Sequence, residues 1–80
     1  HRQGLATEAL LVLIAHLFDD RGHHRLTIDP AADNTAAIAC YAGVGFTEVG
    51  IMRSFERQDD GTWADGILME LLASDPRPAG

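Results

Sequence analysis

The stretch that most constrains the fold of this sequence runs from Asn34 to Phe46 and consists mainly of small and apolar residues. An Asp-Asn pair at its start offers N-cap candidates, and Gly43 and Gly45 near its end supply the backbone freedom that a helix terminus needs. Each residue of an α-helix advances about 1.5 Å and 100°, so positions seven apart lie on nearly one face, roughly 10 Å from each other. We therefore predict a helix over 34–46 that presents Asn34 and Tyr41 along one line.

A second helical pattern begins near the start of the chain and has an apolar stripe from Leu5 to Leu17, with Gly22 as its stop signal. A small-residue loop leading into such a helix leaves N–H groups free at the positive end of the helix dipole. Glycine at position 4 lets the backbone come close to a phosphate, because it has no Cβ. The pattern is typical of an anion site, although the glycine has a purely structural interpretation as well.

Together the two segments resemble the coenzyme motifs of the GCN5-related N-acetyltransferases (GNAT). The resemblance is carried by N-x-x-A-x-x-x-Y-x-x-x-G-F and by R/Q-x-x-G-x-G/A, with Gly4 and Ala6 on the small positions. The resemblance implies acetyl-CoA as cosubstrate, with Asn34 bonding the pantetheine arm and Tyr41 acting as the general acid beside the thioester sulfur. It places the pyrophosphate on the first motif, where His1 replaces the usual arginine or glutamine. The residues that it assigns to coenzyme binding there are Arg2, Gln3, Gly4, Leu5, Ala6 and Thr7.

The remaining segments read as strands. Residues 24–29 alternate polar and apolar up to Pro30, residues 47–52 alternate again, and residues 63–72 resume strand character after an Asp-Gly turn. The last strand is mostly apolar on both sides, which is typical of a strand covered on both faces or of one covered by a partner. We therefore predict an α/β fold: helix, strand, helix and a two-stranded antiparallel hairpin in a mixed sheet. The resemblance implies that this is the carboxyl-terminal half of a GNAT domain.

Composition narrows the function classes. The net charge of −6 argues against nucleic acid as a partner and favours a cationic one. The apolar run at residues 9–15 is too short for a membrane span, so we expect a soluble, cytoplasmic protein with no membrane partner. Cys40, the single cysteine, is predicted to be a buried apolar thiol. The histidines lack metal-ligand spacing, so no metal site is predicted.

At finer grain, Asp29-Pro30 followed by Tyr41, together with the hairpin segment 61–69, resembles the aminoglycoside N-acetyltransferases that act on the 6'-amino group. The resemblance implies that Asp29 contacts the cationic substrate and that Asp65 helps, although Asp60 is an equally good match on the hairpin. Both carboxylates have a plain alternative as solvated surface groups.

Three functions stay open. The favoured one is acetyl transfer to the primary amine of an aminoglycoside; the alternatives are a protein N-terminal or polyamine acetyltransferase and a non-catalytic CoA-binding or assembly module. Residues 1–73 are predicted to be a partial GNAT domain and residues 74–80 a frayed tail. Because the chain begins within a motif, we expect a fragment of a longer domain, incomplete as an enzyme by itself. An exposed strand edge then predicts that the chain dimerises or aggregates, with a homodimer as the specific partner form.

Overall fold

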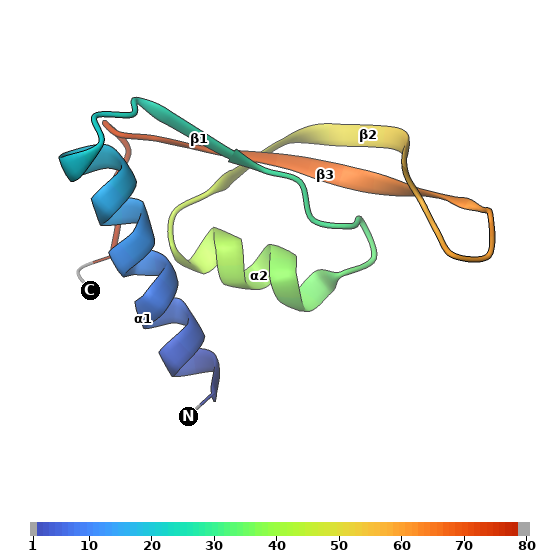
Figure 1. Ribbon diagram of the computed structural model, residues 1–80, viewed down its shortest axis with the longest axis horizontal. Coiled ribbons are helices and arrows are strands. Elements are labelled where there is room, and N and C mark those ends of the chain that lie inside the picture. Colours follow the sequence, from blue (N-terminus) through green and yellow to red (C-terminus); the bar gives the residue numbers. More distant parts are fainter. Residues whose placement is uncertain (1, 79–80) are drawn as a thin grey trace.

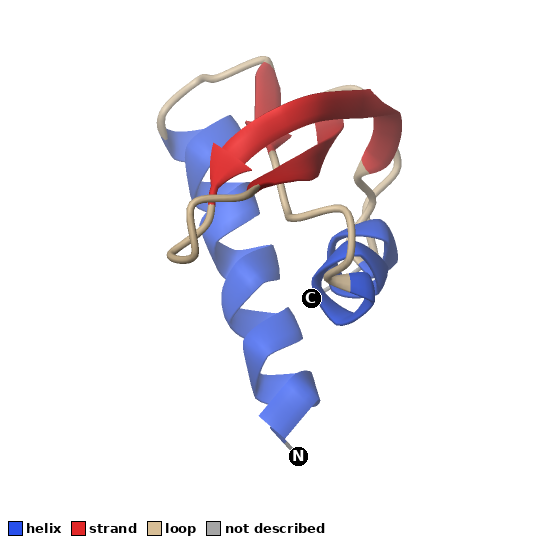
Figure 2. Ribbon diagram, turned by 90° about the vertical axis from the view of Figure 1, so that its right-hand side faces the viewer, coloured by secondary structure: helices blue, strands red, loops and turns tan. Residues whose placement is uncertain are grey.

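The computed structural model describes the backbone of residues 2–78 and the side chains of residues 6–78. The elements are, in order, helix α1 (Arg2–Ala15), a π-helical segment η1 (His16–Asp20), strand β1 (Arg25–Ile28), helix α2 (Thr35–Gly43) and strands β2 (Thr47–Arg57) and β3 (Trp63–Leu72). Both helices lie on the same side of a single sheet, as Figures 1 and 2 show from two directions.

Ile14 is the buried residue of the apolar stripe on the first helix. The helix continues through η1, where Phe18 is buried. The last turn is wide, since the backbone N–H of Arg21 donates to the His16 carbonyl at 3.0 Å, a separation of five residues. Gly22 then adopts a φ of +72°, which ends the helix. The predicted stop at Gly22 is confirmed.

The second helix is shorter than the predicted 34–46 segment. Asn34 is its N-cap, with a non-helical backbone and a side-chain Oδ1 that accepts the Ala37 N–H at 3.1 Å. After the helix ends at Gly43, Gly45 takes a φ of +115°. A Cβ there would lie 3.2 Å from the Pro76 carbonyl oxygen, so this turn needs glycine for both conformation and space.

The sheet has the order β1-β3-β2 and both pairs are antiparallel. Leu26 pairs with Leu71 and Ile28 with Met69, which puts the apolar residues of β1 and β3 on the face toward the helices. The three predicted strands are present, but β2 extends five residues beyond its predicted end. The mixed sheet of the prediction differs in one respect, because the pairing among the described residues is antiparallel throughout.

Bulges interrupt the pairing of β2 with β3 at two places. In the second, Ser54 has a φ of +50°, unusual for a residue with a side chain, and its N–H donates to Asp65 Oδ1 at 2.9 Å. The hairpin turn that follows is closed by the Gln58 N–H donating to the Thr62 carbonyl at 2.8 Å. Gly61 there has a φ of +87°, as the predicted Asp-Gly turn requires.

The core fills the space between the helices and one face of the sheet. Its fully or nearly fully buried side chains are Ile14, Phe18, Val44, Phe46, Ile67, Met69 and Leu71. The other face of β3, with Leu68, Glu70 and Leu72, is only half-buried. Within the described residues β3 is covered on one face only, because both helices pack on the same side, and cover by a partner stays a prediction.

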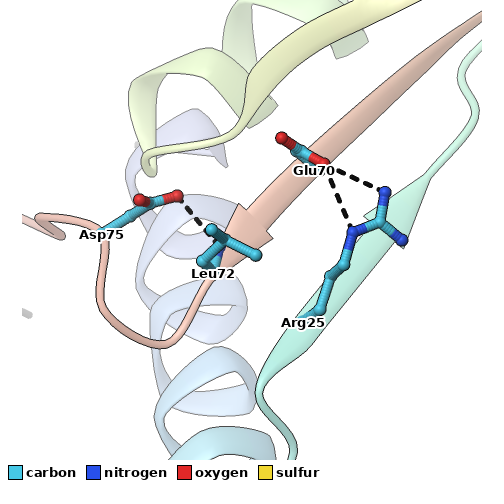
Figure 3. Close-up of polar contacts among 4 residues, drawn as sticks. All are labelled: Arg25, Glu70, Leu72 and Asp75. Atoms are coloured by element: carbon cyan, nitrogen blue, oxygen red, sulfur yellow. Dashed lines mark hydrogen bonds and ion pairs between the residues drawn. The ribbon is translucent and has the colours of Figure 1, made fainter.

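An ion pair lies on the face of the sheet that the helices leave uncovered. Arg25 donates from Nη2 to Glu70 Oε1 at 3.0 Å and from Nε at 3.3 Å, which joins β1 to β3 (Figure 3). Both side chains remain partly exposed, so the pair contributes little stability, about 0–1 kcal/mol.

The chain after β3 folds back against the first helix. Asp75 Oδ2 accepts the Leu72 N–H at 2.9 Å (Figure 3), and the Arg77 guanidinium lies 5.0 Å from the centre of the Phe18 ring. Arg77 also approaches Asp19, with 3.8 Å between Nη2 and Oδ1. These contacts differ from the frayed end predicted for residues 74–80, of which Ala79 and Gly80 lie outside the described residues.

Candidate functional site

A cleft of about 400 Å³ separates the amino-terminal half of α1 from α2. Its walls come from Ala6 and Thr7 on α1 and from Ala36, Ala39 and Cys40 on α2. The three α2 residues are spaced at i, i+3 and i+4, so they form one stripe of that helix. Because the side chains on both walls are small, the two helices leave room for an elongated, largely apolar chain rather than closing on each other.

The predicted phosphate-binding segment lies inside α1 rather than in a loop before it. The helix begins at Arg2, so Gly4 falls in its first turn, which corrects the expected small-residue loop. The first-turn N–H groups of an α-helix have no acceptor within the helix, so the anion-binding property survives this correction. Of the predicted residues, Ala6 and Thr7 line the cleft, whereas the side chains of Arg2, Gln3, Gly4 and Leu5 lie outside the described residues.

Asn34 and Tyr41 do not share one environment. Asn34 is exposed and turns its Oδ1 back onto its own helix, which leaves the amide NH₂ group as the donor available to a ligand. Tyr41 is half-buried and packs against the core, with its ring 6.0 Å from Phe46 in an edge-to-face arrangement. Asn34 is the N-cap and not a helical residue, and its alignment with Tyr41 along one ligand stays a prediction.

The two aspartates predicted to bind substrate lie in different settings. Asp29 is exposed immediately after β1. Asp65 is exposed on β3, where its Oδ1 accepts the Ser54 N–H and its carbonyl accepts the Ala32 N–H at 2.8 Å. Asp65 thus stabilises the β2 bulge, a structural function that sequence reasoning did not assign to it. One of its carboxylate oxygens remains uncommitted.

Other predicted features also change in detail. Cys40 is half-buried and lines the cleft, whereas a fully buried thiol was predicted. His16 pairs with Asp20 at 2.9 Å, and His23 and His24 are exposed, as expected for a turn. Within the described part of the chain, none of the helices combines the length and the apolar character needed to cross a membrane.

Sequence reasoning missed the α2 wall of the cleft. Its signal was the small-residue stripe at positions 36, 39 and 40, which is visible in the sequence but gains meaning only when α1 is placed opposite. It also missed a second hollow between the segment before α2 and the β2–β3 hairpin, which is lined by Asp33, Trp63 and Asp65 among others.

Comparison with known proteins identifies the family. The family model of the acetyltransferase (GNAT) domain matches residues 1–54. The [ribosomal protein bS18]-alanine N-acetyltransferase of Escherichia coli strain K12 is 40% identical over 76 residues, covering 91% of this chain and 48% of that protein. The chain therefore belongs to the GNAT acetyltransferases and spans about half the length of the curated relatives it matches.

Solved structures agree on the fold. A variant of the spermidine N-acetyltransferase SpeG from Vibrio cholerae has a TM-score of 0.84 at 24% identity, covering 89% of this chain and 41% of that one. A GCN5-related N-acetyltransferase from Brucella melitensis also has a TM-score of 0.84, at 26% identity, with 92% and 33% covered. The predicted partial GNAT fold is confirmed, while these relatives are named for a ribosomal protein and spermidine rather than for an aminoglycoside.

Proposed function

We propose that this chain forms the coenzyme-binding half of an N-acetyltransferase that moves an acetyl group from acetyl-CoA to a protein's amino-terminal amine. The observation that carries the proposal is the cleft between α1 and α2 in a chain of the GNAT family. The α1 wall of the cleft, Ala6 and Thr7, follows Gly4 closely in sequence, and the α2 wall lies between Asn34 and Tyr41 in sequence.

The cleft fits an extended coenzyme by size and chemistry. A narrow pantetheine arm needs an apolar channel with few polar partners, and alanine side chains at positions 6, 36 and 39 give it one. The amide NH₂ of Asn34 would donate to a carbonyl of this arm. The first turn of α1 would supply N–H groups to the pyrophosphate, with Gly4 allowing close approach.

The reaction needs a neutral amine and a proton for the departing thiolate. The amine nitrogen forms a bond to the acetyl carbonyl carbon, the C–S bond breaks, and the thiolate takes the hydroxyl proton of Tyr41. The proton lost by the amine passes to a carboxylate or to water. Tyr41 is not among the residues that line the cleft, so its assignment as the donor rests on its position in the GNAT motif. The contact with Phe46 holds its ring in place.

The choice of acceptor rests on the degree of similarity. The alanine N-acetyltransferase is 40% identical in sequence to this chain. The spermidine enzyme is 24% identical, and a sequence identity at that level supports similarity of fold only. The second candidate is a polyamine or aminoglycoside amine, which the exposed carboxylates of Asp29 and Asp65 favour by charge. The third possibility, a non-catalytic CoA-binding module, predicts binding without turnover.

Tyr41→Phe tests the chemistry in the protein that contains this chain. The substitution removes the hydroxyl and keeps the ring that packs on Phe46, so we expect kcat to fall about 100-fold or more while the melting temperature stays unchanged. The measurement is thiol release at saturating acetyl-CoA and acceptor. Unchanged turnover would exclude Tyr41 as the proton donor, and coenzyme binding with no turnover in the natural protein would favour the module.

A panel of acceptors tests the substrate class. A peptide beginning with alanine, spermidine and an aminoglycoside would be compared by kcat/KM under the same conditions. The proposal expects the peptide to be preferred. Preference for the aminoglycoside would favour the hypothesis, drawn from the sequence, that the acceptor is an aminoglycoside.

A further inference from the structure

The chain after β3 packs against the ends of both helices that form the cleft. On one side, the Arg77 guanidinium lies 5.0 Å from the centre of the Phe18 ring, at the end of the first helix. On the other side, the main chain is so close to the turn between α2 and β2 that a Cβ on Gly45 would lie 3.2 Å from the Pro76 carbonyl oxygen. Figure 3 shows this part of the chain beside that turn. Residues 75–78, which we call the C-terminal segment, therefore connect the end of α1 with the end of α2.

Hydrogen bonds at its start fix the direction of the C-terminal segment. Asp75 Oδ2 accepts the Leu72 N–H, and the Asp75 N–H donates to the Leu72 carbonyl, each at 2.9 Å. These two bonds close a turn directly after β3, so the residues that follow leave the sheet along a defined path. That path brings Arg77 back to the first helix, where its side chain is only 25% exposed.

The first helix is loosely packed beside the Arg77 contact. A hollow of about 390 Å³ lies along this side of α1, and its lining residues are Leu11, Val12, Ala15, Asp19, Arg77 and Pro78. Besides its contact with Phe18, the Arg77 side chain approaches Asp19, with 3.8 Å between Nη2 and Oδ1. Removal of this side chain would enlarge the hollow and give the helix room to tilt.

A tilt of α1 changes the cleft because the helix is stiff and has a buried point of support. Ile14, which is 1% exposed, holds the helix in the core. At about 1.5 Å per residue, Phe18 lies about 6 Å beyond Ile14 along the helix, whereas the cleft residues Ala6 and Thr7 lie about 11 Å before it. A displacement at Phe18 therefore becomes a displacement about twice as large, in the opposite direction, at the α1 wall of the cleft.

We propose that the C-terminal segment is a positioning element for the coenzyme cleft, and that Arg77 is the positioning residue. By holding Phe18, Arg77 fixes the tilt of α1 relative to α2, and with it the spacing between Thr7 and Ala36 across the cleft. This inference rests on the proposed coenzyme binding and deepens it. The affinity for acetyl-CoA depends on a side chain that is not among the residues lining the cleft.

Arg77→Ala tests the proposal in the protein that contains this chain, at a temperature well below its melting temperature. We expect the dissociation constant of acetyl-CoA, measured by titration calorimetry, to rise about fivefold, because only molecules with a correctly spaced cleft bind. Arg77→Lys keeps a cation over Phe18 and should retain most of the natural affinity. Arg25→Ala is the matched control, since it also removes an arginine with a carboxylate partner, Glu70, but on the uncovered face of the sheet. It should leave the dissociation constant unchanged.

The spacing of the cleft also has a readout that needs neither catalysis nor coenzyme. Cys40, the single cysteine of these 80 residues, is half-buried and lines the cleft, so its alkylation rate reports how open the cleft is. Without coenzyme, Arg77→Ala should raise the rate of iodoacetamide labelling at Cys40 about threefold, as read by peptide mass spectrometry. Arg25→Ala should leave that rate unchanged, and acetyl-CoA should protect Cys40 in the natural protein.

Two results would overturn the proposal. One is a lowered melting temperature of Arg77→Ala with an unchanged dissociation constant and an unchanged labelling rate, which is what a merely stabilising contact gives. The other is an equal effect of Arg77→Ala and Arg25→Ala. Failure of the proposed function has a different signature: faster labelling of Cys40 in Arg77→Ala, but no protection by acetyl-CoA in the natural protein. That result would support control of the cleft by the C-terminal segment and would exclude the coenzyme from the cleft.

Discussion

At the scale of single residues, Asn34 combines a structural and a proposed functional task. Its Oδ1 accepts the Ala37 N–H, so Asn34→Ala leaves a first-turn donor of α2 without its cap. We expect the free energy of unfolding to fall by about 1 kcal/mol, measured by urea denaturation. If the amide NH₂ also holds the coenzyme, binding of acetyl-CoA weakens in the same variant.

Asn34→Asp separates the two tasks. Aspartate caps a helix as well as asparagine does, so stability should be retained, whereas the donor to the coenzyme is lost. Equal stability of the Ala variant and the natural protein would contradict the capping contribution. Equal coenzyme affinity of the Asp variant would contradict the donor role.

The residues that sequence reasoning placed correctly are those whose environment is local. The cap at Asn34 and the stop at Gly22 depend only on neighbours along the chain, and both are present in the structure. The surroundings of Cys40 and Asp65 were not predicted, because they come from other elements: α1 for the thiol and the bulge at Ser54 for the carboxylate. No local pattern carries that information. Substrate binding by Asp65 stays a prediction.

At the scale of elements, the β2–β3 turn depends on the protonation of Asp60. The hydroxyl of Thr62 donates to Asp60 Oδ1 at 2.6 Å and its N–H donates at 2.9 Å, and these bonds lower the pKa of Asp60 below its usual value of 3.8. A carboxylate with a lowered folded-state pKa stabilises the fold above its unfolded pKa, and the effect disappears as the pH falls through the folded value. We therefore expect the turn to loosen below about pH 4.

Amide hydrogen exchange and the Thr62 N–H chemical shift would follow this loosening as a function of pH. Asp60→Asn keeps an oxygen acceptor but has no charge to titrate, so the acid-dependent step should vanish in that variant. A step of the same size in both proteins would assign it to another carboxylate.

The segment after β3 packs against the first helix and stabilises its position. Arg77 stacks over Phe18 and approaches Asp19, and its side chain is only 25% exposed. Arg77→Ala should lower the free energy of unfolding by about 1 kcal/mol, as judged by denaturant titration. Arg53→Ala, which removes an exposed arginine from β2, serves as the control and should have little effect. Equal effects of the two changes would contradict a specific stabilising contribution from the Arg77 contacts.

Element types were more predictable than element ends. Strand β3 has the predicted bounds because an Asp-Gly turn precedes it and its alternation is strong. Strand β2 was predicted too short, since bulges at two places break the period of two on which the prediction relied. Helix α1 was expected to start after a glycine-containing loop, but the helix continues through Gly4, where the cost of glycine is only about 1 kcal/mol.

At the scale of the whole molecule, the sheet presents an open face and an outer strand with exposed apolar residues. On β2, Val49, Ile51 and Phe55 are all exposed, Ile51 to 67%. Such an edge favours pairing between chains, so we predict concentration-dependent sedimentation of these 80 residues, with a homodimer as the simplest product. Ile51→Lys should reduce the association, because a lysine on an edge strand opposes pairing.

Val12→Lys is the matched control, since Val12 is 69% exposed on α1 and the chemical change is the same. It should leave the sedimentation behaviour unaltered. A single sharp monomer boundary at all concentrations, or an equal effect of the two lysines, would contradict association through β2.

The candidate site was predictable in kind but not in arrangement. Motif spacing indicated that the start of α1 and the α2 helix serve one ligand, and the cleft between Thr7 and Ala36 agrees with that expectation. The hollow between the segment before α2 and the β2–β3 hairpin could not be predicted, because Asp33 and Trp63 line it together only when the strand order brings the hairpin beside that segment. Long-range pairing of this kind leaves no periodic trace in the sequence.

The position of β3 between β1 and β2 has a consequence for how the chain is made. Of the three described strands, the central one comes last along the chain, so β1 gains its β3 partner only when Met69 arrives opposite Ile28. Until then the apolar side of β1 is exposed to solvent and depends on chaperones or on speed of synthesis for protection. A ribosome stalled before Leu72 would hold two nascent helices and an unclosed sheet, a species that proteases should clear.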